Sequence, residues 1–253
     1  METVQQISIF DVLSKQEKYV RRIQSKEAAP FIREIHYSRK VPNITDAFGL
    51  FVDGELIGVC TYGIPASRPL CVGLAGKENV DRVKELNRLV IKPEYNGGGY
   101  NYASYLVSHS LKMLENGTFV VSYADPSWTH VGYVYQACNF LYTGLSAKRV
   151  DYYQSSGLHP RSFVKGKGQT DILQTRIQKH RYVYLVGDRR TKKQMRKCLK
   201  YPILDKYPKG DETHYDIHNP QIVEHVQIVS RKKPYKVNQK TISPDKEMMA
   251  DNA

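Results

Sequence analysis

The chain has 253 residues, a formal net charge of +13 and 41% hydrophobic residues, enough to build one large domain or one domain with an extension. Its four cysteines are scattered with no CxxC spacing, so reduced thiols are favoured over a disulfide framework or a structural metal site. The first ten residues lack the pattern of a signal peptide, and no apolar run is long enough to cross a membrane. We therefore expect a cytoplasmic protein that does not enter a membrane; its oligomeric state is left open.

The first half of the chain carries the clearest local patterns. The spacing of apolar residues over 11–25 predicts an amphipathic helix, and a polar loop holding His36 and Tyr37 follows it. Two apolar runs in 48–63 flank Asp53-Gly54, which predicts a β-hairpin with a tight turn. Alternation over 84–92 predicts a strand that ends at Pro93. The Gly-rich loop PEYNGGGYN then leads into a predicted helix that ends at Gly117.

The second half predicts a strand at 118–124, a short helix near 129–138, a strand-like segment at 139–146, a helix near 170–178, a strand at 181–187 and a basic helix near 190–199. A hairpin that continues into a strand–helix–strand crossover indicates an α/β (α+β) fold with a mixed sheet and helices on its faces. We expect a catalytic domain at 1–188, a basic extension at 189–230 and a disordered tail at 231–253.

The NGGG loop is a candidate anion site. Backbone N–H groups at a Gly-rich entry to a helix can point at one phosphate, aided by the helix dipole. The loop matches neither a Walker A motif nor GxGxxG, and a flexible surface loop explains it about as well. If it binds the pyrophosphate of a cofactor such as coenzyme A, the residues that hold it are Asn96, Gly97, Gly98, Gly99, Asn101 and Ser104.

The segment SYADPSWTHVGYVYQACNFLYTG, residues 122–144, is the strongest candidate for chemistry. Asp125 stands where a strand ends before Pro126, the usual place for a polar group that faces a crevice in an α/β sheet. The many tyrosines around it fit either an aromatic core or walls that hold a flat ring. His130 is more often a structural residue than a base.

Two further candidates lie upstream. His36 and Tyr37 stand in a non-periodic segment and have little reason to be core residues, although a surface position explains them too. Arg88 lies in the strand 84–92 between apolar neighbours, where we expect it to need a carboxylate or a phosphate as partner.

The charge indicates a polyanion as partner, although a merely soluble basic protein is the plain alternative. Cations are densest in the predicted helix near 190–199, and the candidate DNA-binding residues there are Arg189, Arg190, Lys192, Lys193, Arg196 and Lys197. A second group, Arg231 to Lys233, lies in the tail and fits a solvated arm.

In chain order, HYSRKVP, FGLFVDGELIGVCTYG, ELNRLVI, NYASYLVSHSLKML and VVSYADPSWTHVGYVYQACNFLYTG resemble the phage Mom DNA-modification proteins. The resemblance covers about residues 30–145 and continues weakly through KHRYVYLVGD. The block from SYADP to NFLYTG is its most specific part.

This resemblance implies a fold like that of the GCN5-related N-acetyltransferases and conversion of the N6 amine of adenine in double-stranded DNA to the carbamoylmethyl form, which protects phage DNA from host restriction in the cytoplasm of the infected cell. It also implies binding of acetyl-CoA, and iron has been proposed for the family. Matched by motif, the site residues are His36, Tyr37, Arg88, Ser104, Asp125 and Tyr135. The loop PEYNGGGYNYAS is longer and richer in glycine than the family pattern, which puts the phosphate contacts in doubt.

As a mechanism we expect a flipped adenine between the aromatic walls Tyr37, Tyr123, Trp128 and Tyr135. Asp125 is the expected general base, and Tyr37 or Tyr135 the expected proton donor. A metal set of His36, Asp125 and His130 is one option that their spacing does not demand. The alternatives are an acetyl-CoA-dependent N-acetyltransferase for a protein or small-molecule amine, and a non-catalytic DNA-binding protein.

Overall fold

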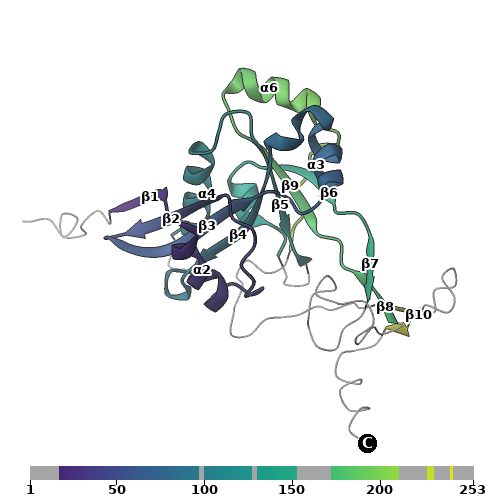
Figure 1. Ribbon diagram of the computed structural model, residues 1–253, viewed down its shortest axis with the longest axis horizontal. Coiled ribbons are helices and arrows are strands. Elements are labelled where there is room, and N and C mark those ends of the chain that lie inside the picture. Colours follow the sequence, from purple (N-terminus) through teal and green to yellow (C-terminus); the bar gives the residue numbers. More distant parts are fainter. Residues whose placement is uncertain are drawn as a thin grey trace, which may run out of the picture. The chain divides into compact units, whose positions relative to one another are not determined.

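The computed structural model describes residues 17–96, 100–126, 130–152, 172–210, 227–230 and 240–241. The described strands form two sheets (Figure 1). The order in the seven-stranded sheet is β1 (Lys18–Arg22), β2 (Asp46–Val52), β3 (Glu55–Gly63), β4 (Val83–Ile91), β5 (Phe119–Ala124), β9 (His180–Leu185) and β6 (Leu141–Leu145). Strands β1 to β4 pair antiparallel, whereas β4 and β5 pair parallel. The mixed sheet predicted from the sequence is therefore confirmed.

The chain divides into two compact units. The first comprises Met1–Ser122, Val134–Phe140 and Val183–Tyr201, and the second comprises Tyr123–Tyr133, Leu141–Tyr182 and Pro202–Ala253. The second unit contains the four-stranded antiparallel sheet, in the order β11 (Lys240–Thr241), β10 (Gln227–Ser230), β8 (Ile172–Arg176) and β7 (Arg149–Tyr152). The tail predicted at 231–253 lies outside the described residues except for β11.

The hairpin of β2 and β3 forms as predicted. Asp53 and Gly54 have φ angles of 48° and 83°, the left-handed values that a two-residue turn of this type requires at both positions. Both strands are apolar along most of their length and are buried. Local turn chemistry and burial therefore favour the same register.

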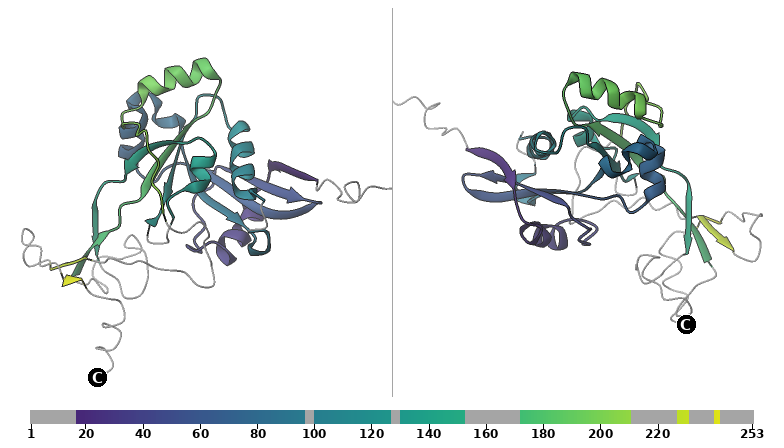
Figure 2. Two further views of the ribbon diagram at one scale, coloured as in Figure 1. Left: turned by 180° about the vertical axis from the view of Figure 1, so that it is seen from behind. Right: turned by 45° about the horizontal axis from the view of Figure 1, so that its top comes forward.

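Helices cover both faces of strands β2 to β4. Helix α2 (Ser25–Glu34) lies on one face and α4 (Tyr102–Lys112) on the other (Figures 1 and 2). Ala28 and Ile32 of α2 pack on Ala47, Val59 and Val90, all of them buried. The two apolar helix faces thus convert the sheet into the central layer of a three-layer unit.

A buried polar contact fixes α4 on the sheet. The hydroxyls of Tyr62 on β3 and Ser110 on α4 lie 2.7 Å apart, and both side chains are fully buried. Ser110 Oγ also donates to the Val107 carbonyl of its own helix. Since an unsatisfied buried hydroxyl is costly, this pair sets the position of α4 more specifically than apolar packing does.

Two predicted helices are wrong. Lys18–Arg22, within the helix expected at 11–25, forms the edge strand β1, which pairs with β2; residues 11–16 lie outside the described part. Ile172–Arg176, within the helix expected near 170–178, forms β8 between β7 and β10. In both places a neighbouring strand supplies hydrogen-bond partners for the backbone. This pairing outweighs the helix-like spacing of apolar residues over a short segment.

The remaining elements include α3 (Arg68–Ala75), which the sequence patterns did not reveal, and the 3₁₀ turns η1 (Lys77–Arg82) and η2 (Pro93–Tyr95). The predicted short helix is α5 (Tyr133–Ala137), and the predicted basic helix is α6 (Arg189–Cys198). Asp188 caps α6 by accepting a hydrogen bond from the Thr191 N–H at 2.7 Å. Within the described residues, no helix is both long and apolar enough to cross a bilayer.

Candidate active site

The first feature of the site is the short pairing between β4 and β5. Their parallel register runs only from Val83–Phe119 to Glu85–Val121. Immediately beyond it, the Leu86 carbonyl accepts a hydrogen bond from Ser122 Oγ at 2.9 Å. The register with β3 also shifts here, because Thr61 pairs with Arg88 and Tyr62 with Leu86. A side chain thus replaces the missing ladder partner at an irregular point of the sheet, the kind of place where active sites occur.

Tyr135 on α5 lies beside Ser122 at this irregular point of the sheet, within the first unit. Its hydroxyl hydrogen-bonds with the Ser122 side chain, and its ring packs on Phe140 with centroids 5.3 Å apart. Burial is the main cause that raises the pKa of Tyr135; Tyr37 and Glu85 raise it further, and the Ser122 bond lowers it. The hydroxyl therefore keeps its proton at neutral pH and can act as a hydrogen-bond donor.

Arg88 ties β4 to the loop that follows α2. Its Nε and Nη2 donate to the Lys40 carbonyl at 3.1 and 2.9 Å, and Nη1 donates to the Asn87 carbonyl at 2.6 Å. Burial lowers the pKa of Arg88, and the neighbouring Tyr37 and Glu85 raise it. These hydrogen-bond partners are carbonyl oxygens, where a carboxylate or phosphate was expected. Arg88 brings the loop of His36 and Tyr37 against the β4 strand.

His36 and Tyr37 form the third part of the site. Their rings lie 4.2 Å apart between centroids, and His36 is 9% exposed. Ser38 contacts the ring of His36 through both its backbone N–H and its hydroxyl. Within the first unit, the structure therefore brings together Tyr37, Arg88 and Tyr135, three of the residues predicted from the sequence.

A cavity of about 390 Å³ lies at the start of α4 in the first unit. Two predicted cofactor residues, Asn101 and Ser104, line it, and Ser104 Oγ donates to the Asn101 carbonyl at 3.0 Å. The other lining residues are Lys18, Tyr100, Tyr102, Tyr105, Ser108, Ala137 and Cys138. Asn96 and Arg88 do not line it, and Gly97, Gly98 and Gly99 lie outside the described residues.

Sequence reasoning missed the aromatic and cationic wall of this cavity. Tyr100 and Tyr102 stack at 5.2 Å, and the Lys18 ammonium stands 4.9 Å from the centre of the Tyr105 ring. A run of three tyrosines in YNYASY was a visible signal for the wall. Lys18 could not be found in the same way, because it comes from β1, a strand that was predicted as helix.

Asp125 follows β5 directly and belongs to the second unit. It is 8% exposed, and its Oδ2 lies 2.6 Å from the Lys179 ammonium. Burial lowers the pKa of His130, and the charge of Asp125 raises it. The expected polar position at the strand end is thus occupied by a carboxylate that forms an ion pair with a lysine. No sequence pattern pointed to Lys179.

The remaining predicted residues divide into two groups. Tyr123 lies on β5, whereas Trp128 is outside the described residues. Among the residues that the structure describes, no three His, Cys, Asp or Glu side chains gather to hold a metal, so the set of His36, Asp125 and His130 is not found as a site.

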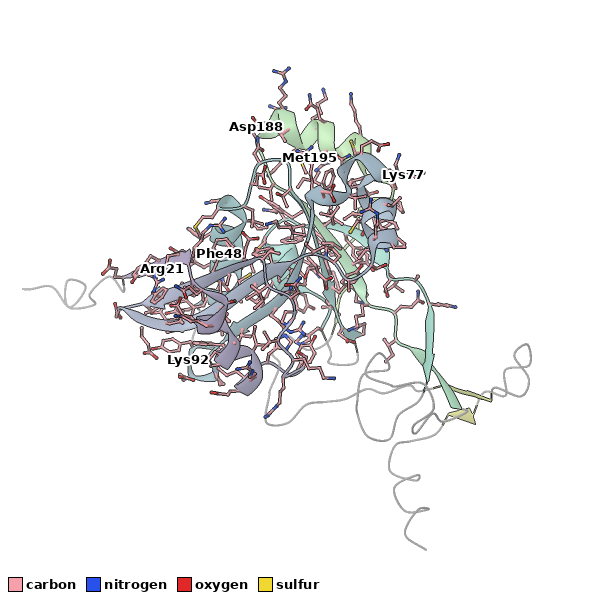
Figure 3. All side chains as sticks on the ribbon, in the orientation of Figure 1. Arg21, Phe48, Lys77, Lys92, Asp188 and Met195 are labelled. Atoms are coloured by element: carbon pink, nitrogen blue, oxygen red, sulfur yellow. The ribbon has the colours of Figure 1, made fainter. Side chains whose placement is uncertain are left out.

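Helix α6 presents the predicted basic surface. Met195 is its buried residue, and most of its cations are exposed; long side chains project from this helix in Figure 3, where Asp188 marks its start. Lys192 lies over the Tyr184 ring, 4.7 Å from its centre. None of the ion pairs among the described residues involves α6. Such a one-sided row of cations suits a phosphate backbone.

Solved structures similar to the chain include three acetyltransferases. An N-acetyltransferase from Staphylococcus aureus Mu50 is 14% identical, with a TM-score of 0.39, over 67% of this chain and 99% of the other. An IAA acetyltransferase from Bacillus cereus ATCC 14579 is 14% identical, with a TM-score of 0.37, over 66% of this chain and 98% of the other. A Bacillus subtilis acetyltransferase in complex with CoA is 13% identical, with a TM-score of 0.39, over 67% of this chain and 97% of the other.

No curated protein sequence matches the chain. The model of the Mom protein family, in contrast, matches residues 17–209. This range includes most of the first compact unit, part of the second, the residues Tyr37, Arg88 and Tyr135, the cavity at α4 and the basic helix α6. The chain belongs to the Mom protein family.

Proposed function

We propose that the protein converts the N6 amine of adenine in double-stranded DNA to the carbamoylmethyl form and thereby protects phage DNA from host restriction. The observation that carries this proposal is the family match over residues 17–209. The site supports it with a half-buried tyrosine whose hydroxyl keeps its proton, a cavity for a cofactor and an exposed row of cations.

The reaction must overcome two properties of adenine. The N6 lone pair is delocalised into the ring, and the base is stacked and paired, so it must be extruded at a cost of roughly a few kcal/mol. In our proposal Tyr37 contributes an aromatic wall, and Asp125 takes up the proton that N6 loses as N6 forms its bond to the transferred carbon. Tyr135 donates a hydrogen bond to the leaving group, which departs with the electron pair of the bond broken at that carbon. Arg88 holds the loop that carries Tyr37.

The cavity at α4 is the proposed place for an acyl-CoA cofactor. The cavity lies at the N-terminus of α4, where backbone N–H groups can bind phosphate. Its tyrosines can stack on a purine ring, and Lys18 adds a positive charge. Asn101 and Ser104 are the proposed polar contacts. DNA would be held by α6 through Arg189, Arg190, Lys192, Lys193, Arg196 and Lys197, which fixes position without reading sequence.

Nucleoside mass spectrometry of DNA from cells that express the protein tests the reaction. We expect carbamoylmethyl adenine with the natural chain. With Tyr135→Phe we expect a loss of about 10²–10⁴-fold, the usual value of a proton donor or acceptor, while DNA binding is retained. Unmodified adenine together with an accumulating acetylated amine would instead favour an N-acetyltransferase. Unchanged modification by Tyr135→Phe would remove this tyrosine from the mechanism.

Calorimetric titration with coenzyme A tests the cavity. We expect Lys18→Glu to weaken binding about tenfold, because it places a negative charge beside the bound phosphates. Lys26→Glu changes the same charge at an exposed position of α2 and is the matched control. Equal affinities of the two variants would place the cofactor elsewhere.

A further inference from the structure

A short turn after α2 fixes the ring of His36. The Arg39 N–H donates to the His36 carbonyl at 2.9 Å, and Arg39 has a φ of 47°, which closes the turn. Inside this turn the Ser38 N–H donates to His36 Nδ1 at 3.0 Å, and Ser38 Oγ lies 2.9 Å from the same nitrogen. Nδ1 thus occupies the place of the side-chain oxygen in an Asx-turn, where Asn or Asp accepts from the backbone two residues on.

These contacts decide which nitrogen of the neutral ring carries hydrogen. A backbone N–H is only a donor, so the nitrogen that faces it at 3.0 Å must accept and therefore has no hydrogen. The hydroxyl of Ser38 can turn its own hydrogen toward Nδ1 as a second donor. In a neutral imidazole the hydrogen then resides on Nε2.

We propose that His36 takes part in the reaction as a hydrogen-bond donor through Nε2–H, with Ser38 as the positioning residue that selects this tautomer. The inference deepens the proposed function and rests on it. A general base at Nε2 would need a bare nitrogen there and a hydrogen on Nδ1, against the Ser38 N–H. A metal bound at Nε2 has the same requirement, since metal-bound histidines usually donate through the other nitrogen.

The position of the ring fits this role. His36 is nearly buried beside Tyr37, and Tyr37 interacts electrostatically with both Arg88 and Tyr135. A fixed donor in such a place stabilises negative charge that develops on an acceptor atom of the reactants without a cost of reorientation. Acceptor atoms of this kind are the carbonyl oxygen of a transferred group and the ring nitrogens of adenine.

Nitrogen NMR of the full chain, labelled at histidine, tests the tautomer without any assay of activity. We expect the His36 signals to show a protonated Nε2 and an unprotonated Nδ1, assigned by their loss in His36→Asn. Ser38→Ala keeps the backbone N–H, so its His36 signals should still show a protonated Nε2 and an unprotonated Nδ1. A protonated Nδ1 in the natural chain would overturn the proposal.

Two variants test the role in catalysis. His36→Asn keeps an acceptor for the Ser38 N–H but has no donor at the Nε2 position, so adenine modification should fall by about 10²-fold or more with the melting temperature little changed. His36→Gln places an amide N–H near that position and should recover part of the activity. Full activity of His36→Asn would refute the donor role. If the natural chain modifies no adenine while NMR finds Nε2–H, the proposed function fails and the tautomer stands.

Discussion

At the scale of single residues, burial and hydrogen bonding set what each polar group can do. Tyr135 keeps its proton because its hydroxyl is buried, and His36 is held in one tautomer by the residue two positions on. The thiol of Cys138, in the wall of the cavity, has its pKa raised to about 11 by burial, and that of Cys60 to about 12. These thiols are therefore poor nucleophiles at neutral pH.

The contact of Tyr62 with Ser110 gives a stability prediction at this scale. Ser110→Ala should lower the free energy of unfolding by about 1–3 kcal/mol, because it leaves the buried Tyr62 hydroxyl without this partner. Tyr62→Phe should cost less, since it removes the polar group itself. Urea unfolding of the two variants and of the double variant measures the coupling. Strictly additive effects would show that the contact does not stabilise α4 on the sheet.

At the scale of elements, Asp46 links strands β1, β2 and β4. It bonds Arg22 at 2.7 Å and pairs with Lys84, and Arg22 in turn donates to the Met113 carbonyl at the end of α4. Burial raises the pKa of Asp46, but the hydrogen bonds from Lys84, Arg22 and Thr45 outweigh it and hold this pKa below the usual 3.8. The carboxylate thus joins the edge strand β1, which the sequence pattern predicted as a helix, to strands β2 and β4 of the first unit.

The depressed pKa gives the sign of a pH effect. Since Asp46 is more acidic folded than unfolded, its stabilisation is complete above its unfolded pKa, near 3.8, and is lost as pH falls through the lower folded value. At pH 7 Asp46→Asn should lower the unfolding free energy by about 1–3 kcal/mol. The difference from the natural chain should shrink below about pH 3.8 in urea titrations. Asp81→Asn, at an exposed position, is the control; a pH-independent difference would contradict the account.

The elements also show how far sequence patterns reach. The hairpin and β4 were predictable because the Asp53-Gly54 turn, the alternation and the end at Pro93 are local signals. Helix α4 was predicted too, but it ends at Lys112, before the predicted end at Gly117. Strands β1 and β8 were not, since each is a strand only through pairing with distant segments. The same holds for the site: the types of residue in HYS and YQA were visible, whereas the contacts of Ser38, Ser122 and Lys179 were not.

At the scale of the whole molecule, a charge of +13 predicts that the proposed binding to DNA depends on salt. We predict that changing Arg190, Lys193 and Lys197 to Gln weakens DNA binding at all sequences and lowers the salt slope by about one for each lost phosphate contact. Filter binding at several salt concentrations measures both. Lys26, Arg33 and Lys112 changed to Gln remove the same charge elsewhere. Equal loss in both triple variants would mean that net charge alone, rather than α6, governs binding.

The sequence by itself determined the class of the fold, the hairpin, the basic helix and the types of residue available for chemistry. These follow from period, turn residues and composition, all of which act over a few positions along the chain. Only the tertiary structure decided that Lys18–Arg22 is a strand, that Lys18 and Tyr105 form one cavity wall, and that His36 accepts at Nδ1. The reason is physical: strand pairing, cavities and proton positions depend on atoms that folding brings together from separate segments, and no local pattern encodes these distances.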